Sequence, residues 1–217
     1  MGQRPATVVV AAREPNTPVV VIDLDHTLVD APFWRVLVGM GGPMAGSVEV
    51  VRRLGEEYQV LYLTHRPDIM TQRSKEWLVE HGYPVAPMRV STISQAIGGS
   101  GRYKAAALAE LMEEFKRVEI GIGDKLSDAE AYVQNGMTAY LIPHYDAGDA
   151  GEVLEMAEAI RELGQRVEDM EAQLQVVDGW AEVEAGIFEG ERFEAGAFSG
   201  ELERLGRSLT QREEDDD

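Results

Sequence analysis

Carboxylate, hydroxyl and amine side chains occur at several places in this sequence in patterns that could carry out chemistry. Asp23 and Asp25 close an apolar run, and Thr27 follows two residues later. The other candidates, farther along the chain, are Thr64, Lys104, Asp124 and Asp128. Aspartate is a poor strand former, so its repeated place after apolar runs needs an explanation. Turn and helix-cap chemistry can explain one such aspartate, but several such sites together indicate a reactive centre.

These residue types suit magnesium binding and phosphoryl transfer. Two close carboxylates repel each other unless a cation lies between them, and Mg²⁺ prefers oxygen ligands and also binds substrate phosphate. One carboxylate can attack a phosphoryl group, while a second protonates the leaving oxygen and later deprotonates water. Thr64 and Lys104 would orient the phosphoryl oxygens and neutralise their charge. The chemistry that fits these residues best is therefore Mg²⁺-assisted phosphoryl transfer.

Apolar bursts alternate with amphipathic stretches over the first 146 residues. The apolar bursts predict strands at 18–25, 59–63, 87–91, 118–122 and 138–142. The amphipathic stretches predict helices at about 47–58, 68–81, 103–116 and 127–135. This alternation is typical of an α/β fold, a Rossmann-like parallel sheet with helices on both faces. Ligands of such sheets bind beyond the carboxyl ends of the strands, which is where Asp23, Thr64 and Asp124 fall.

The motifs, in this order and at these strand ends, resemble those of the haloacid dehalogenase superfamily over about residues 18–143. They are Asp23-x-Asp25-x-Thr27, Thr64, Lys104 and Gly123-Asp124-x-x-x-Asp128. The resemblance implies a phosphomonoester hydrolase with Asp23 as nucleophile, Asp25 as general acid and base, and an aspartyl-phosphate intermediate. Thr64 and Lys104 would be its phosphate ligands. It also implies a Mg²⁺ ion held by Asp23, the main-chain carbonyl of Asp25, Asp124 and Asp128.

Within this superfamily, three local stretches are similar to the lipin-type phosphatase domain and its relatives in phosphatidylinositol transfer proteins, and more loosely to polynucleotide kinase-phosphatases. They are residues 62–68, 77–84 and 128–132. The lipin pattern has glycine where this chain has His26 and His65, so each histidine either contacts substrate or takes the place of a loop glycine. Arg66 either holds a substrate group or pairs with Asp68. Thr27, His65 and Arg66 are our candidate substrate-binding residues.

The motif spacing leaves room for a minimal cap or none. The stretch 31–46, with Phe33 and Trp34, is long enough for a flap but not for a separate domain. An open site of this kind admits a large substrate or is covered by a partner subunit. The two aromatic side chains would either cover substrate or pack the flap onto the body of the domain.

Composition restricts the classes of protein and partner. The 217 residues include no cysteine, which excludes thiol catalysis and thiolate metal sites. The 39 acidic against 20 basic side chains give a net charge of −19, which disfavours nucleic acids and anionic membrane surfaces as partners. The longest apolar run is too short to cross a bilayer, and no signal peptide is recognisable. We therefore expect a cytoplasmic protein with a small or medium phosphorylated substrate.

The charge is concentrated in the last third of the chain. Residues 147–217 carry a net charge of −15, and this asymmetry predicts two parts, a catalytic domain at 1–146 and an acidic extension at 147–217. Apolar residues in the extension alternate spacings of three and four at Val153, Met156, Ile160, Leu163, Val167, Met170, Leu174 and Val177. This seam predicts one helix over about 152–178 that pairs with its copy in a homodimer, or else packs on its own domain.

The residues after this seam have a weaker pattern. Trp180 and several later aromatic residues could anchor on the globular domain or on a second subunit, and 212–217 is expected to be disordered. Removal of 152–217 would then leave a folded monomer.

Two further functions compete with the hydrolase. A non-catalytic module could keep the fold and bind a phosphorylated ligand or protein without turnover. A nucleic-acid 3′-phosphatase would need a basic groove, for which the charge of this chain gives no indication.

Overall fold

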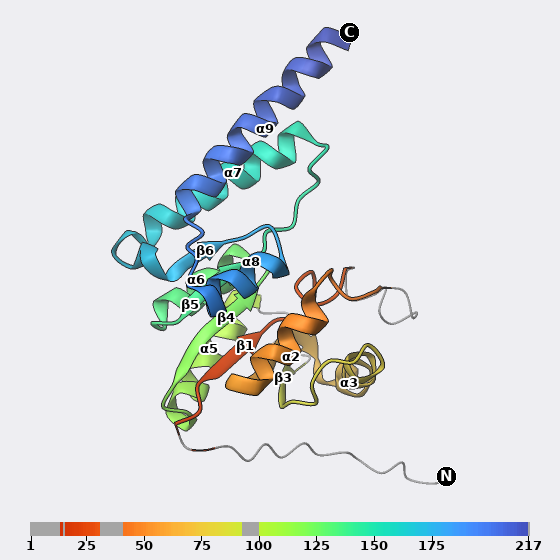
Figure 1. The fold of residues 1–217 in the computed structure, drawn as a ribbon, viewed down its shortest axis with the longest axis vertical. Coiled ribbons are helices and arrows are strands. Elements are labelled where there is room, and N and C mark those ends of the chain that lie inside the picture. Colours follow the sequence, from red (N-terminus) through yellow and green to blue (C-terminus); the bar gives the residue numbers. More distant parts are fainter. Residues whose placement is uncertain (1–13, 15, 31–40, 93–99, 217) are drawn as a thin grey trace.

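The predicted strands form one parallel sheet at the centre of the molecule (Figure 1). The computed structural model describes residues 14, 16–30, 41–92 and 100–216. The strands are β1 (Val19–Ile22), β2 (Gln59–Pro67), β3 (Met88–Ser91), β4 (Val118–Gly123), β5 (Thr138–Leu141) and β6 (Leu174–Val176). They lie in the order β3-β2-β1-β4-β5-β6 and all neighbours are parallel. The order reverses between β1 and β4, and a crevice at such a reversal is where open α/β sheets bind ligands.

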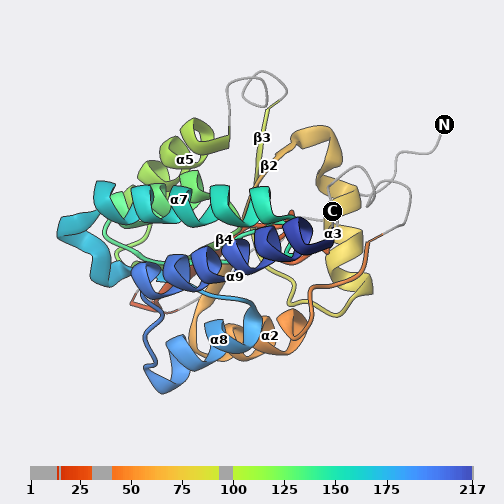
Figure 2. The ribbon, with the colours of Figure 1, turned by 90° about the horizontal axis from the view of Figure 1, so that it is seen from above.

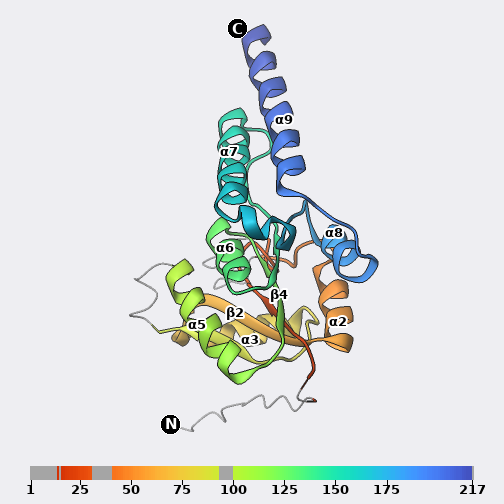
Figure 3. The same cartoon turned by 90° about the vertical axis from the view of Figure 1, so that its left-hand side faces the viewer.

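Helices cover both faces of the sheet (Figure 3). One face packs against α2 (Ser47–Glu57), α3 (Thr71–Glu80) and α8 (Trp180–Glu184). The other face packs against α5 (Ser100–Glu114), α6 (Leu126–Gln134), α7 (Ala150–Arg166) and α9 (Ala195–Asp216). Shorter helical turns are η1 (Asp68–Met70), η2 (Glu168–Gln173) and η3 (Ala185–Glu189). None of the helices in the described part of the chain combines the length and apolar character needed to cross a bilayer.

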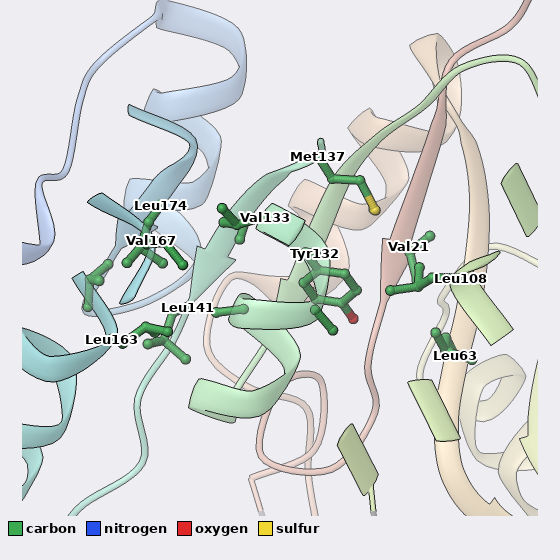
Figure 4. Close-up of a cluster of buried hydrophobic side chains, with 14 of the residues drawn as sticks. Val21, Leu63, Leu108, Tyr132, Val133, Met137, Leu141, Leu163, Val167 and Leu174 are labelled. Carbon is green, nitrogen blue, oxygen red and sulfur yellow. The ribbon is translucent and has the colours of Figure 1, made fainter. Parts of the chain in front are cut away.

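Strand β1 shows why the sheet needs both layers of helices. Val19 and Val21 belong to the core on the α5–α6 side, whereas Val20 and Ile22 belong to the core on the α2 side, and all four are fully buried. A strand with both faces covered has no polar alternation. Figure 4 shows the first of these cores, in which Val21 and Leu108 lie near the ring of Tyr132.

The ring of Tyr132 packs directly on the backbone of β4. A Cβ atom at Gly121 would lie 2.2 Å from this ring, so only glycine lets the helix α6 approach the strand so closely. This contact holds the first turn of α6, which carries Asp128, against the carboxyl end of β4. The contact thereby fixes the distance between Asp128 in α6 and Asp124, which follows β4.

The predicted strands and helices of the first 146 residues are confirmed, with ends shifted by a few residues. The sheet with helices on both faces is also confirmed. The predicted helix at 68–81 begins with the turn η1 and continues as α3. Most of the flap predicted for 31–46, including Phe33 and Trp34, lies outside the described residues.

The prediction of one helix over 152–178 is wrong. Helix α7 ends at Arg166, a 3₁₀ turn follows, and the Leu174–Val176 segment forms β6, which pairs with β5. An apolar spacing of three and four does not separate a helix from a short buried strand. Here the open edge of β5 decides, because its backbone groups need partners.

The apolar seam of the predicted coiled coil is used inside the chain. Its members Val153, Ile160, Leu163 and Val167 are buried in the same core as β1, and α7 lies beside α9 (Figure 2). Residues 147–217 thus share a sheet and a core with the preceding part, instead of forming a separate extension. The homodimer stays a prediction, now without this support.

The disorder expected at 212–217 is not seen as far as Asp216, the last residue of α9, and Asp217 lies outside the described residues. Its last turns are rich in Gln, Arg and Glu, which have high helix propensity and need no core to stay helical on the end of a long helix. The far end of α9 extends away from the sheet (Figure 1).

Candidate active site

Three carboxylates meet at the carboxyl ends of β1 and β4, beside the reversal of strand order. Asp23 follows β1, and its backbone N–H donates to the carbonyl of Ile122 in β4 at 3.0 Å. Asp124 follows β4, and Asp128 lies in the first turn of α6. One carboxylate oxygen from each aspartate lies within 4.8 Å of the others. The structure thus brings Asp23 together with Asp124 and Asp128, which lie more than one hundred positions later in the sequence.

Lys104 of α5 neutralises part of this negative charge. Its side chain is fully buried, and its Nζ lies 3.1 Å from Oδ2 of Asp23 and also contacts Asp128. Burial alone would lower the pKa of Lys104, but the charges of Asp23 and Asp128 outweigh it and raise the pKa above its usual value. The ammonium group therefore stays charged between the two carboxylates.

One ammonium group does not balance three buried carboxylates. Burial raises the pKa of Asp124 to about 8, and the negative charge of Asp23 adds to this shift. Burial likewise raises the pKa of Asp128. Oδ1 of Asp124 and Oδ1 of Asp128 are buried and have no hydrogen-bond partner within the described part of the chain. An all-oxygen cluster with an excess of negative charge and unused acceptors fits a divalent cation such as Mg²⁺.

Asp25 does not join this cluster and instead pairs with Arg66. Nη2 of Arg66 lies 2.6 Å from Oδ1 of Asp25, and Nε lies 3.1 Å from Oδ2. Nη1 of the same guanidinium donates to Oγ of Ser74 in α3 at 3.0 Å. Only 4% of Arg66 is exposed. The two roles predicted for Arg66 are binding of a substrate group and an ion pair with Asp68. The structure shows neither, because the guanidinium is paired with Asp25.

The two threonines are both fully buried near the strand ends. The hydroxyl of Thr64 accepts a hydrogen bond from the backbone N–H of Arg66 at 3.3 Å. The hydroxyl of Thr27 has no partner among the described residues. The carbonyl of Thr27 accepts a 2.7 Å hydrogen bond from Nε1 of Trp180 in α8, 153 residues away. One of the expected aromatic anchors therefore holds the loop that follows β1.

Two of the histidines face each other beside this loop. His26 has a positive φ of 54°, and its ring centroid lies 4.1 Å from that of His144, which follows β5. Burial and then the charge of His144 lower the pKa of His26, and the charge of Asp25 opposes them. The ring of His65 lies 5.7 Å from the ring of Tyr103. The sequence gives His144 no functional signal, because a lone histidine in a loop has no motif around it.

Comparison with known families shows which part of this chain is similar to a described domain. Residues 20–142 match the family "PITM 1-3, LNS2 domain". The chain belongs to this family. The LNS2 match runs from β1 to the residue after β5, so it includes every candidate site residue named above except His144.

Curated relatives of this LNS2 chain include "Membrane-associated phosphatidylinositol transfer protein 3" from Homo sapiens and from Mus musculus. Each is 33% identical over 96 residues, which cover 43% of this chain and 10% of the relative. The aligned stretch is thus only 10% of the length of these relatives.

Solved structures show the fold of this LNS2 chain. It is similar to the D,D-heptose 1.7-bisphosphate phosphatase from B. bronchiseptica, with a TM-score of 0.52 and 14% identity over 80% of this chain and 99% of that one. It is also similar to a HAD-like phosphatase from Mesorhizobium loti, with a TM-score of 0.51 and 18% identity over 71% of this chain and 91% of that one. The predicted fold of the haloacid dehalogenase superfamily is confirmed.

Proposed function

We propose that this LNS2 chain is a Mg²⁺-dependent phosphomonoester hydrolase in which Asp23 is the nucleophile. The observation that carries the proposal is the meeting of Asp23, Asp124 and Asp128 around the buried ammonium of Lys104. Buried carboxylates in such numbers lower the stability of the folded chain. Their presence therefore points to a ligand or a reaction that needs them. The fold shared with phosphatases adds support.

The donor set suits a magnesium ion. Carboxylate oxygens of Asp23, Asp124 and Asp128 would hold it, and the resemblance to the superfamily adds the main-chain carbonyl of Asp25. When bound, the ion would neutralise charge on the phosphoryl oxygens and on the carboxylates themselves. The unpartnered Oδ1 atoms of Asp124 and Asp128 would then gain a partner.

In the first step, a carboxylate oxygen of Asp23 attacks phosphorus, and the bond from phosphorus to the leaving oxygen breaks. Asp25, in its protonated form, gives its proton to that leaving oxygen. Lys104 and the hydroxyl of Thr64 bind phosphoryl oxygens and hold the group in line with the attack. In the second step, water attacks the aspartyl-phosphate, Asp25 takes the water proton, and phosphate leaves with Asp23 restored.

Arg66 would position Asp25 for both proton transfers. Its guanidinium holds both carboxylate oxygens, and Ser74 holds the guanidinium in turn. The Asp25 carboxylate is therefore fixed by two elements, β2 and α3, rather than by its own loop. A positioned acid is worth more than a mobile one because no orientation entropy is lost during the reaction.

The test is hydrolysis of 4-nitrophenyl phosphate by the purified chain, with Mg²⁺ and with a chelator. We expect turnover only with the metal, and Asp23→Asn should abolish turnover while circular dichroism shows an intact fold. The matched control is Asp68→Asn, because Asp68 is exposed in η1. Unchanged turnover in Asp23→Asn would refute the assignment of the nucleophile. Phosphate-ester binding by the wild-type protein without hydrolysis would instead favour the binding module.

A further inference from the structure

His26 occupies a backbone conformation that favours glycine. It is the one non-glycine residue with positive φ among those that the structure describes. A side chain in the left-handed region costs conformational energy that glycine would not incur. An outlier of this kind beside a reactive group points to a role for the side chain. Here the outlier lies between Asp25 and Thr27, in the loop that carries the candidate acid.

The ring of His26 is held by a second histidine from another strand end. His144 follows β5, and the planes of the two rings are inclined by 30° with centroids 4.1 Å apart. His26 is half-buried and His144 is exposed, so ligands can reach the pair. Within the described part of the chain, neither ring forms a hydrogen bond, which leaves their ring nitrogens available to a ligand.

Lys125 adds a positive charge on the same side. It is exposed and comes directly before α6, between Asp124 and the first turn of that helix. Because β1, β4 and β5 are parallel neighbours, the residues that follow them, including His26, Lys125 and His144, lie along one edge of the sheet. The two imidazoles and the ammonium group can each donate N–H groups, and they lie at the ends of β1, β4 and β5. Lysine is rare in this chain, so a lysine at this place is notable.

We propose that His26, His144 and Lys125 bind a second anionic group of the substrate, a phosphate or a carboxylate several bonds away from the phosphoryl group that Asp23 attacks. The inference rests on the proposed hydrolase and narrows its substrate class to phosphomonoesters with two anionic groups. Binding of a remote group supplies energy that orients the reacting group.

The first experiment compares alkanediol bisphosphates of two to six carbons with alkyl monophosphates of equal length, and with phosphates that end in a carboxylate. At the best length, we expect kcat/KM for a dianionic-ended substrate to exceed that of its monophosphate by about tenfold, mainly through KM, as charge-assisted hydrogen bonds would give. His144→Ala should reduce this ratio to near unity, and His144→Gln should retain part of it. The carboxylate series shows whether phosphate or carboxylate is the preferred group.

The matched control is His81→Ala, because the ring of His81 stacks on Trp77 at 4.4 Å, away from the strand ends. It should keep the wild-type ratio. Equal kcat/KM for both substrate series, or a ratio that survives His144→Ala, would overturn the subsite and leave the hydrolase standing. Absence of hydrolysis for every substrate would refute the hydrolase instead.

A second measurement does not depend on turnover. Alkane bisphosphonates, which cannot be hydrolysed, should shift the imidazole NMR signals of His26 and His144 at concentrations where alkyl monophosphonates do not. The signals of His81 should remain in place with both compounds. Imidazole signals of His26 and His144 that respond equally to both compounds, or to neither, would contradict the subsite even in a chain without turnover.

Discussion

The segment that matches the LNS2 family and the segment after it differ in what they bury. Within the described residues, every buried charged side chain lies in residues 20–142, namely Asp23, Arg66, Lys104, Asp124 and Asp128. Residues 143–217 carry most of the negative charge of the chain, yet they bury apolar side chains and the neutral Gln175 and Ser199. Buried charge lowers stability, whereas buried apolar surface raises it.

The difference indicates a division of labour within one sheet. The family segment carries the chemistry, and the following segment adds β6 to the sheet, apolar side chains of α7 to the core and Trp180 to the loop after β1. A site with uncompensated carboxylates can persist only on a scaffold that is stabilised elsewhere. Each of the following changes tests one side of this comparison.

The largest effect is expected from truncation. A chain that ends at Ile142 loses β6, exposes the edge of β5 and removes the apolar face of α7 from the core. We expect it to show no cooperative thermal transition by circular dichroism. A chain that ends at Gln211 loses residues 212–217, of which 212–215 are exposed in α9, and it should melt like the full chain. A cooperative transition in the shorter chain would show that the family segment is stable by itself.

Replacement of the buried ammonium should be the next largest effect. Lys104→Met leaves three buried carboxylates without a cation and should lower the free energy of unfolding by about 3–5 kcal/mol. Mg²⁺ should restore part of this loss, because a ligand that binds only the folded state stabilises it. Urea unfolding with and without Mg²⁺ measures both effects. Lys116→Met is the control, since Lys116 is exposed; an equal response of the two variants would contradict the charge argument.

Arg66→Lys tests the positioning of the acid. Lysine is a point charge that cannot hold both oxygens of Asp25, so kcat for an alkyl phosphate should fall by about 10–100-fold. The fall should be much smaller for 4-nitrophenyl phosphate, whose leaving group needs no proton. Steady-state kinetics on the two substrates gives the comparison, with Arg73→Lys as the control. Equal losses on both substrates would contradict a role in protonating the leaving group, because they would place the effect of Arg66 on the second step, which both substrates share, or on the structure.

Trp180→Phe removes the indole donor to the carbonyl of Thr27 and keeps most of the packing. The free energy of unfolding should fall by about 1–3 kcal/mol, the cost of leaving a buried acceptor unpaired, and turnover should fall with it. Trp77→Phe removes a similar bond, from Nε1 of Trp77 to the carbonyl of Gly41. That control should lose stability but keep kcat, so a loss of kcat in both variants would count against a specific role of Trp180.

His26→Gly should give the smallest effect and the only gain. Relief of the positive φ should stabilise the chain by about 1 kcal/mol and raise its melting temperature by roughly 2–4 °C. Differential scanning calorimetry measures the shift. A lower melting temperature would mean that the ring contact with His144 outweighs the strain.

The part of the site that could be predicted is the part in which residue type and spacing are unusual. Paired aspartates after a buried strand, and a later pair spaced by three residues, restrict both the chemistry and the place in the sheet. The contact of Asp25 with Arg66 could not be predicted, because it depends on the rotamers of a side chain in the loop after β1 and of another in β2. Local spacing also offers no signal for Ser74, which lies on a helix behind the guanidinium.

The fold shows the same limit. Strands β1 to β5 are apolar, short and bounded by turns, so they are readable from the sequence. Strand β6 is not, because Leu174 and Val177 fit a helical seam as well as a strand, and only the open edge of β5 distinguishes them. The hydrogen bond from Trp180 to Thr27 likewise depends on where α8 lies in the finished sheet.

That hydrogen bond also has a consequence for the order in which the protein becomes active during synthesis. The loop after β1 leaves the ribosome early, but the indole that fixes it lies 153 residues later. At about 5–20 residues per second, the interval is roughly 8–30 s. Once Asp124 and Asp128 have also been made, 52 residues remain up to Trp180, and over that stretch the loop after β1 still lacks its support. A nascent chain stalled before Trp180 should therefore be inactive, which would delay hydrolysis until nearly the whole sheet has been translated.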